Sequence, residues 1–137
     1  MARDDVRTAR LTLRVDLGPD HAIGPGKIKL LEAIGDTGSI SQAGRALGMS
    51  YRRAWLLVDD LNKCFRQPVV SAQTGGSRGG GAVLTAFGAK LVEQYRAIER
   101  EAHAATARRL RELAAAQRPD KAARPRRRAR AEDDPAS

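Results

Sequence analysis

Apolar residues recur at two different spacings along this chain, and each spacing predicts one kind of element. Residues 11–17 alternate between apolar and polar side chains, which indicates a short half-buried strand that Gly18-Pro19 would end. Further along the chain, apolar residues follow a helical spacing. We therefore expect helices over 27–36, between Ser41 and Gly48, over 51–65 and over 86–116.

Small polar residues and glycines mark the ends of the two central helices. Ser41 and Ser50 are the expected N-caps, because a serine hydroxyl can accept a hydrogen bond from a free amide of the first turn. Gly48 is the expected stop of the first helix, because glycine readily adopts the left-handed conformation. The turn 47–50 thus joins a helix of about two turns to a longer one.

A glycine-rich segment with a single cation follows these helices. Short apolar runs at 69–72 and 82–84 predict a β-hairpin, and the tip between them contains five glycines and Arg78. A nucleotide phosphate loop is excluded, because no Gly-Lys-Ser/Thr leads into a helix here. The tip would approach a DNA phosphate or the minor groove, or it is merely a flexible hairpin end.

The charge balance favours a polyanionic partner. The chain has 137 residues, with 25 Lys and Arg against 16 Asp and Glu, and a formal charge of +9. Nucleic acid and an anionic membrane surface both fit this balance. No apolar run approaches the roughly 20 residues of a membrane-spanning helix, and the N-terminus shows no apolar signal segment. We therefore expect a cytoplasmic protein without a membrane partner.

Catalytic and metal-binding chemistry has few residues to draw on. His21 and His103 lie far apart, and Cys64 is the only cysteine and has no His or Cys neighbour. Neither a zinc ligand set nor an intramolecular disulfide is therefore expected. Cys64 is interpreted as a small buried apolar residue and His103 as an ordinary exposed helix residue. The sequence predicts no catalytic residue, no cofactor and no metal, and hence a protein that is not an enzyme.

The two central helices and their glycine-containing turn, over 38–65, are typical of a helix-turn-helix, whose second helix enters the major groove of DNA. Its reading end would carry arginines, which pair with guanine through two parallel hydrogen bonds. Cations at a helix N-terminus oppose the helix dipole, so a phosphate or guanine edge would account for them; a solvated charged turn is the alternative. The expected DNA-binding residues are Ser39, Ser41, Gln42, Ser50, Tyr51, Arg52, Arg53, Thr74 and Arg78.

Together these elements predict a mainly α fold with a small β-hairpin, namely a winged helix-turn-helix with a long C-terminal dimerisation helix. The domain would span 10–116, between a flexible N-terminus at 1–9 and a disordered basic tail at 117–137. An apolar stripe on the last helix predicts a homodimer, or else packing against its own domain; the stripe comprises Leu91, Tyr95, Ile98 and Ala102.

Two stretches resemble the N-terminal DNA-binding domain of the molybdate-responsive ModE regulators. The first, 38–55, ends in Ser-Tyr-Arg-Arg-Ala-Trp, and the second, 74–88, contains Thr-Gly-Gly and Gly-Gly-Gly-Ala. The first is also similar to LysR-type regulators. The resemblance covers roughly 11–110 and implies a homodimer on a palindromic operator of molybdate-uptake or molybdoenzyme genes. Members of that family continue into molybdate-binding domains, whereas this chain continues into the basic tail, so no molybdate site is expected here.

The sequence thus predicts a DNA-binding transcription regulator that recognises double-stranded DNA at a palindromic operator as a homodimer. Two alternatives stay open. One is a non-specific nucleic-acid-binding or nucleoid protein that the basic surface and tail would drive, with a steep salt dependence. The other is a DNA-binding subunit that takes its signal from a separate sensor protein.

Overall fold

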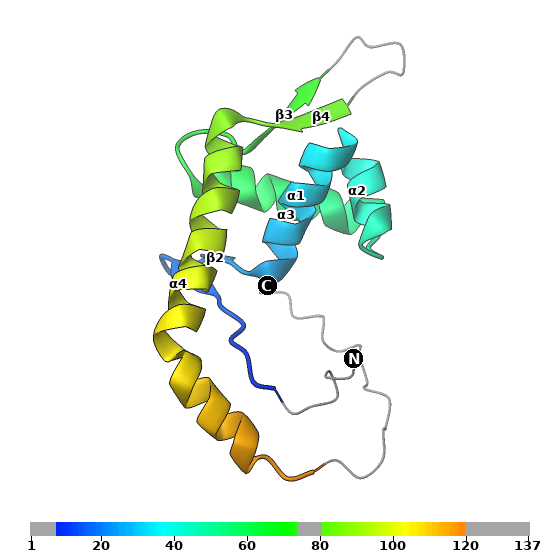
Figure 1. Cartoon of the computed structure of the whole chain (residues 1–137). Helices are drawn as coiled ribbons and strands as arrows, with labels where there is room; N and C mark the ends of the chain where they lie inside the picture. Colours follow the sequence, from blue (N-terminus) through cyan, green and yellow to red (C-terminus); the bar gives the residue numbers. More distant parts are fainter. Residues whose placement is uncertain (1–7, 74–80, 120–137) are drawn as a thin grey trace.

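The computed structural model describes residues 8–73 and 81–119. Within these ranges the chain forms four helices and two small antiparallel sheets (Figure 1). The elements follow one another as β1 (Val15–Leu17), β2 (His21–Ile23), α1 (Pro25–Thr37), α2 (Ile40–Ala46), α3 (Tyr51–Cys64), β3 (Val70–Gln73), β4 (Gly81–Leu84) and α4 (Ala86–Ala116).

The N-terminal sheet is a hairpin of β1 and β2, with Asp16 opposite Ala22. The chain reverses at Gly18, whose φ of +72° lies in the left-handed region that favours glycine. The expected strand over 11–17 is therefore too long at its start, and its partner β2 was not predicted. Residues 11–14 run extended without a strand partner.

The extended residues before β1 are held by side chains of α4. The backbone N–H of Leu11 donates to Nε2 of His103 at 3.0 Å, and the hydroxyl of Tyr95 donates to the carbonyl of Leu13 at 2.7 Å. The expectation that His103 is an ordinary exposed residue is wrong, because it is half-buried and accepts this hydrogen bond. These contacts join segments about 80 to 90 positions apart in the sequence.

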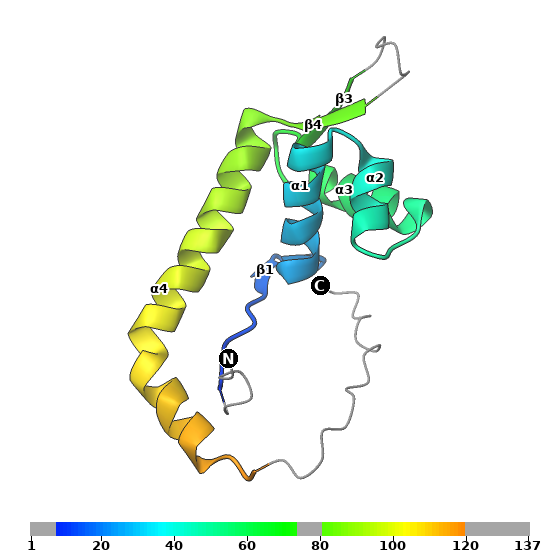
Figure 2. The same ribbon diagram turned by 45° about the vertical axis from the view of Figure 1, so that its right-hand side comes forward.

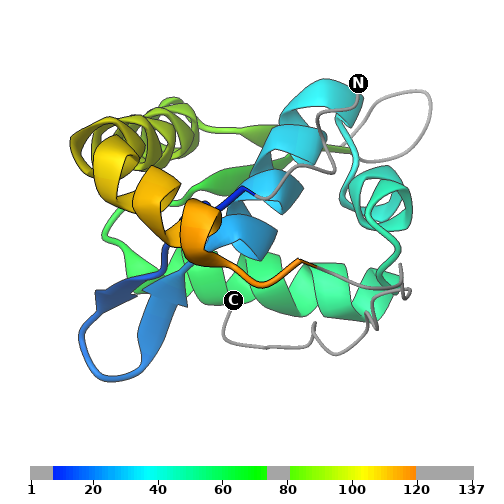
Figure 3. The same ribbon diagram turned by 60° about the horizontal axis from the view of Figure 1, so that its bottom comes forward.

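Helix α1 is the centre of the core. Four of its side chains have no exposed surface: Ile28, Leu30, Leu31 and Ile34. Figure 3 shows α1 between α2 and α4. The helix begins at Pro25, two residues before the expected start, since proline suits the first helical position. Gly38 ends it with a φ of +72°.

Helices α2 and α3 meet closely at Gly44. A β-carbon at this position would lie 2.9 Å from that of Ala54, so only glycine fits without a shift. Ser39, rather than the expected Ser41, caps α2 by accepting from the N–H of Gln42. Ser50 caps α3 as predicted, and Gly48 occupies the turn between them with a φ of +75°.

The second sheet pairs β3 with β4 and is anchored by one side chain of α3. Oδ1 of Asn62 accepts from the N–H groups of Val69 (2.7 Å) and Val70 (3.1 Å), and its Nδ2 donates to the carbonyl of Val70 at 3.2 Å. The N–H of Ala82 in turn donates to the carbonyl of Gly38. The sheet is therefore tied to both α3 and the end of α1.

Helix α4 confirms the predicted bounds of 86–116. Its first half packs on α1, where Arg96 pairs with Glu32, and only its last turns extend beyond the N-terminal segment (Figure 2). No helix in residues 8–73 and 81–119 is long and apolar enough to cross a membrane.

The predicted fold class is wrong. The structure has four helices and two separate two-stranded sheets, instead of a mainly α domain with one hairpin that acts as a wing. The alternation over 11–17 predicts a lone strand, whereas the turn at Gly18 lets residues 15–17 pair with residues 21–23. We do not retain the winged helix-turn-helix assignment.

Candidate nucleic-acid interface

The outward face of α3 carries an exposed group of apolar side chains. Tyr51, Trp55 and Leu56 are 57%, 43% and 55% exposed. Tyr51 and Trp55 are one turn apart and share one side of the helix, whereas Leu56 lies about 100° further round, on another side. The helix packs into the core through Ala54, Val58 and Leu61. We call Tyr51 and Trp55 the α3 apolar patch.

The two members of this patch are joined by a hydrogen bond. Nε1–H of Trp55 donates to the hydroxyl oxygen of Tyr51 at 2.6 Å. The Tyr51 hydroxyl hydrogen is not used in this bond, so it can donate to an acceptor outside the protein. The pairing fixes two exposed rings relative to each other before any partner arrives.

Arginines occupy exposed positions in α2 and in the first turn of α3. Arg45 in α2 and Arg52 and Arg53 in α3 are exposed, and the segment 40–58 contains no Asp or Glu. None of the three is in an ion pair within the part of the chain that the structure describes. The first acid on this side of α3 is Asp59, and Lys63 pairs with it at 3.0 Å. The first two turns of α3 are therefore a cationic surface.

A groove of about 490 Å³ lies beside the patch, between α2, α3 and the second sheet. Among the predicted site residues, Ser39, Ser41 and Tyr51 line it, together with Trp55 and Asn62. The hydroxyl of Ser39 is engaged as the cap of α2. Four further predicted residues are exposed but do not line the groove: Gln42, Ser50, Arg52 and Arg53. Thr74 and Arg78 lie outside the described residues.

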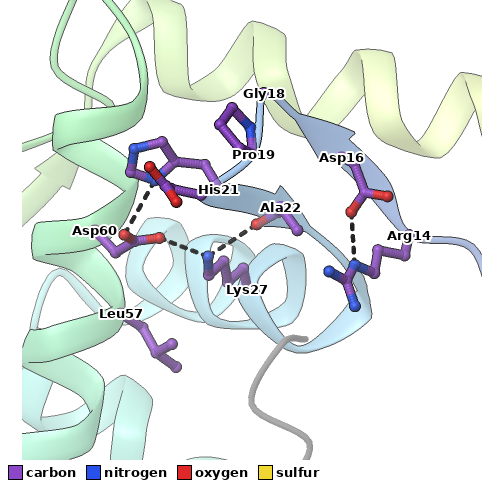
Figure 4. A pocket seen from close by; sticks show the side chains of 10 residues that line it. Arg14, Asp16, Gly18, Pro19, His21, Ala22, Lys27, Leu57 and Asp60 are labelled. Carbon is purple, nitrogen blue, oxygen red and sulfur yellow. Dashed lines mark hydrogen bonds and ion pairs between the residues drawn. The ribbon is translucent and has the colours of Figure 1, made fainter.

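A second pocket, of about 650 Å³, holds a cluster of charges (Figure 4). Nζ of Lys27 donates to Oδ2 of Asp60 at 2.7 Å and to the carbonyl of Ala22 at 2.8 Å. Oδ1 of Asp60 lies 3.2 Å from Nδ1 of His21. Lys27 is only 5% exposed, so its charge requires this compensation.

This cluster connects three elements. His21 belongs to β2, Lys27 to α1 and Asp60 to α3. Partial burial raises the pKa of Asp60, but the hydrogen bond and charge of Lys27, with His21, outweigh burial and lower the pKa overall. The carboxylate therefore stays charged and keeps α3 in place against α1 and the N-terminal hairpin. Sequence reasoning missed the cluster; a lysine on the buried side of an apolar helix was its only signal.

The second pocket offers little for catalysis. Its lining contains no Ser, Thr, Cys or Tyr that the pair of His21 and Asp60 could activate. In the described ranges, no three His, Cys, Asp or Glu side chains are grouped as metal ligands would be. Cys64 is half-buried, and burial together with the charge of Asp60 raises its pKa, so the thiol stays protonated. The charged side chains of this pocket form contacts that join β2, α1 and α3.

Known proteins match much of this chain, although no protein-family model does. The molybdenum-pterin-binding protein MopB of Rhodobacter capsulatus is 48% identical over 96 residues, which is 70% of this chain and 35% of MopB. The molybdenum transport protein ModE of Azotobacter vinelandii is 41% identical over 68% of this chain and 34% of its own length. The DNA-binding transcriptional dual regulator ModE of Escherichia coli K12 is 38% identical over 64% of this chain and 33% of its own length.

The chain is similar to Mop proteins and ModE regulators. It spans about a third of the length of the curated relatives that it matches. These relatives are named as binding, transport and regulatory proteins, and none of the three is named as an enzyme.

These names correct the resemblance drawn from the sequence. It was placed with the N-terminal DNA-binding domain of ModE, as a unit separate from molybdate binding. That placement is wrong, because a match over 70% of this chain is to a protein named for binding molybdenum-pterin. The expectation of no molybdate site in this chain cannot be kept for the same reason, and the likeness to LysR-type regulators finds no support among these relatives.

Proposed function

We propose that this chain binds double-stranded DNA and takes part in molybdenum-dependent control of transcription. The observation that carries the proposal is the N-terminal end of α3, which is exposed and cationic and has no acid nearby in the sequence. A helix end of this kind suits the major groove, where arginine recognises guanine and phosphate. The relatives named as ModE regulators support this assignment, and the names of ModE and MopB support the connection to molybdenum.

The proposal divides the site residues by role. Arg52 and Arg53 would read base edges or hold phosphates, and Ser50 would fix the start of the helix. Ser39, Ser41 and Gln42 at the start of α2 would contact the sugar-phosphate backbone. Thr74 and Arg78, which lie outside the described residues, remain candidates for contacts from the segment between β3 and β4.

We further propose that two copies bind a palindromic operator as a homodimer through α4. Two residues of the predicted stripe are used inside the chain, since Tyr95 is 2% exposed and Leu91 packs against the core. Ile98 remains 44% exposed and Leu113 66% exposed, so these side chains are free to contact a second copy. Sedimentation of the full chain tests this step. A monomer at micromolar concentration would contradict it.

The experiment for DNA binding begins with recovery of preferred duplexes from a random pool by the full chain. Arg53→Ala is expected to weaken binding to a recovered duplex by about 1–3 kcal/mol and to relax the sequence preference. Arg100→Ala is the matched control, because it removes one equally charged and exposed side chain from α4. Equal losses for the two variants, or equal losses on recovered and random duplex, would favour the non-specific alternative.

The molybdenum step is tested separately. Binding to the recovered duplex is measured with and without molybdate, at constant ionic strength. A change in affinity supports molybdenum-dependent control by this chain. Specific DNA binding that is indifferent to molybdate would leave the DNA proposal intact and reject the molybdenum step.

A further inference from the structure

We propose that residues 8–13 form a pH-sensitive strap, which lies on α4 while the side chain of His103 is neutral and detaches when that side chain takes up a proton. The N-terminal strap is the extended segment before β1, and none of its residues has a strand partner. The inference is independent of DNA binding, because it concerns only the contacts between this segment and α4.

Both nitrogens of the His103 ring face the backbone. The N–H of Leu11 lies 3.0 Å from Nε2, and the carbonyl oxygen of Glu99 lies 2.9 Å from Nδ1. A carbonyl only accepts, so Nδ1 holds a proton, and an amide N–H only donates, so Nε2 holds none. The neutral ring with its proton on Nδ1 is therefore the one form that satisfies both contacts. A proton on Nε2 would place two donors against each other and leave the N–H of Leu11 without its partner.

The N-terminal strap has few other contacts that could replace this bond. The hydroxyl of Tyr95 donates to the carbonyl of Leu13 at 2.7 Å, which is the only other hydrogen bond between residues 8–13 and the rest of the described chain. Leu11 and Leu13 are half-buried, but neither packs against the hydrophobic core, whereas Val15 does. Loss of the bond to His103 therefore removes one of two hydrogen bonds and frees the strap as far as β1.

The charged groups around the ring give its protonated form no ion pair. Glu99 and Arg96 lie one and two turns before His103 on the same side of α4, and they pair with each other at 2.7 Å. Arg96 also pairs with Glu32 of α1 at 2.8 Å. The positions that continue this side of α4 are uncharged, namely 106, 107, 110 and 114. The flanking cations are exposed, Arg10 on the strap and Arg100 on α4. Within the described residues, His103 has no ion pair of its own.

These contacts determine the direction of the pH effect. The attached strap requires a neutral ring, whereas the detached strap leaves Nε2 free to bind a proton, so the detached state binds more protons. Attachment is therefore most stable at high pH and weakens as pH falls through the range in which histidine side chains change their charge, between about pH 5 and 8. Carboxylates ordinarily titrate below this range, so ion pairs of glutamate stay intact across it.

Nuclear magnetic resonance of the isotope-labelled full chain tests the inference across this pH range. Long-range proton–nitrogen spectra identify the protonated ring nitrogen, which we expect to be Nδ1 of a neutral ring at the upper end. As pH falls, the amide signal of Leu11 should shift with the same midpoint as the His103 ring. Its protection from hydrogen exchange, corrected for the intrinsic rate, should fall about fivefold, which corresponds to one neutral hydrogen bond of about 1 kcal/mol. Amides of α1 should keep their protection.

A pair of matched substitutions assigns the effect to one ring. His103→Gln retains an oxygen that can accept from the N–H of Leu11 but takes up no proton in this range, so the protection of that amide should no longer depend on pH. His21→Gln is the control, because it makes the same change at the other histidine of the chain, which lies in β2 and contacts Asp60. The pH dependence at Leu11 should persist in this control.

Four other results would each overturn the inference. A neutral ring with its proton on Nε2 contradicts the hydrogen-bond pattern. A Leu11 amide that does not respond to the titration of the ring means that other contacts suffice to hold the strap. These two results come from the unaltered protein, so they do not depend on the folding of a variant. A pH dependence that persists in His103→Gln assigns the effect to another group. A parallel loss of protection in α1 indicates global unfolding instead of local release.

Discussion

Asn62 gives the sharpest prediction about stability. Its side chain takes the place of backbone hydrogen-bond partners at the start of β3. Oδ1 accepts from the N–H groups of Val69 and Val70 at 2.7 and 3.1 Å, and Nδ2 donates to the carbonyl of Val70 at 3.2 Å. Val69 and Val70 are 0% and 5% exposed, so water replaces the lost bonds poorly. Each bond is worth about 0.5–1.5 kcal/mol, and a buried group left without a partner costs more. Asn62→Ala should therefore lower the free energy of unfolding by about 2–4 kcal/mol.

Two variants separate the hydrogen bonds from simple loss of side-chain volume. Asn62→Leu keeps the side-chain volume and loses all three hydrogen bonds, so it should cost about as much as Asn62→Ala. Gln67→Ala removes an exposed amide from the following loop and should change stability by less than about 0.5 kcal/mol.

Urea unfolding, followed by circular dichroism, measures these differences for all three variants. Hydrogen exchange at the amides of Val69 and Val70 reports the local effect, which should exceed that at the amides of α1. A loss below about 0.5 kcal/mol for Asn62→Ala would refute the reasoning, since it would mean that the N–H groups find other partners at no cost.

Three further changes test other parts of the fold. Gly44→Val should lower the thermal midpoint and cost about 1–3 kcal/mol, because a β-carbon there meets that of Ala54, and scanning calorimetry measures it. The hydrogen bond from Arg96 depresses the pKa of Glu32 below its usual 4.5, so the pair stabilises the fold above that value and loses its effect as pH falls further. Glu32→Gln should flatten this part of the stability curve, and an unchanged curve would contradict it. Tyr95→Phe should cost about 1 kcal/mol in urea unfolding and speed hydrogen exchange in the extended N-terminal segment, whose carbonyl the hydroxyl binds.

Local signals in the sequence determined several features of this protein. The bounds of α4 and the cap at Ser50 follow from apolar spacing and from the hydroxyl that a first turn needs, and neither depends on a distant residue. The exposed arginines at the start of α3 were also predictable, because a charged side chain without a partner stays in water. The assignment of these arginines to a DNA-binding site stays a prediction.

The tertiary structure decided the features that depend on residues far apart in the sequence. The pairing of β1 with β2 needs the reversal at Gly18. Asp60 contacts both Lys27 and His21, which lie 33 and 39 residues before it in the sequence. No local pattern encodes such contacts, since their energy appears only when the chain has closed the intervening loop. The extent of the α3 apolar patch is also a tertiary fact, because packing on one side of the helix determines which apolar side chains remain exposed on the other.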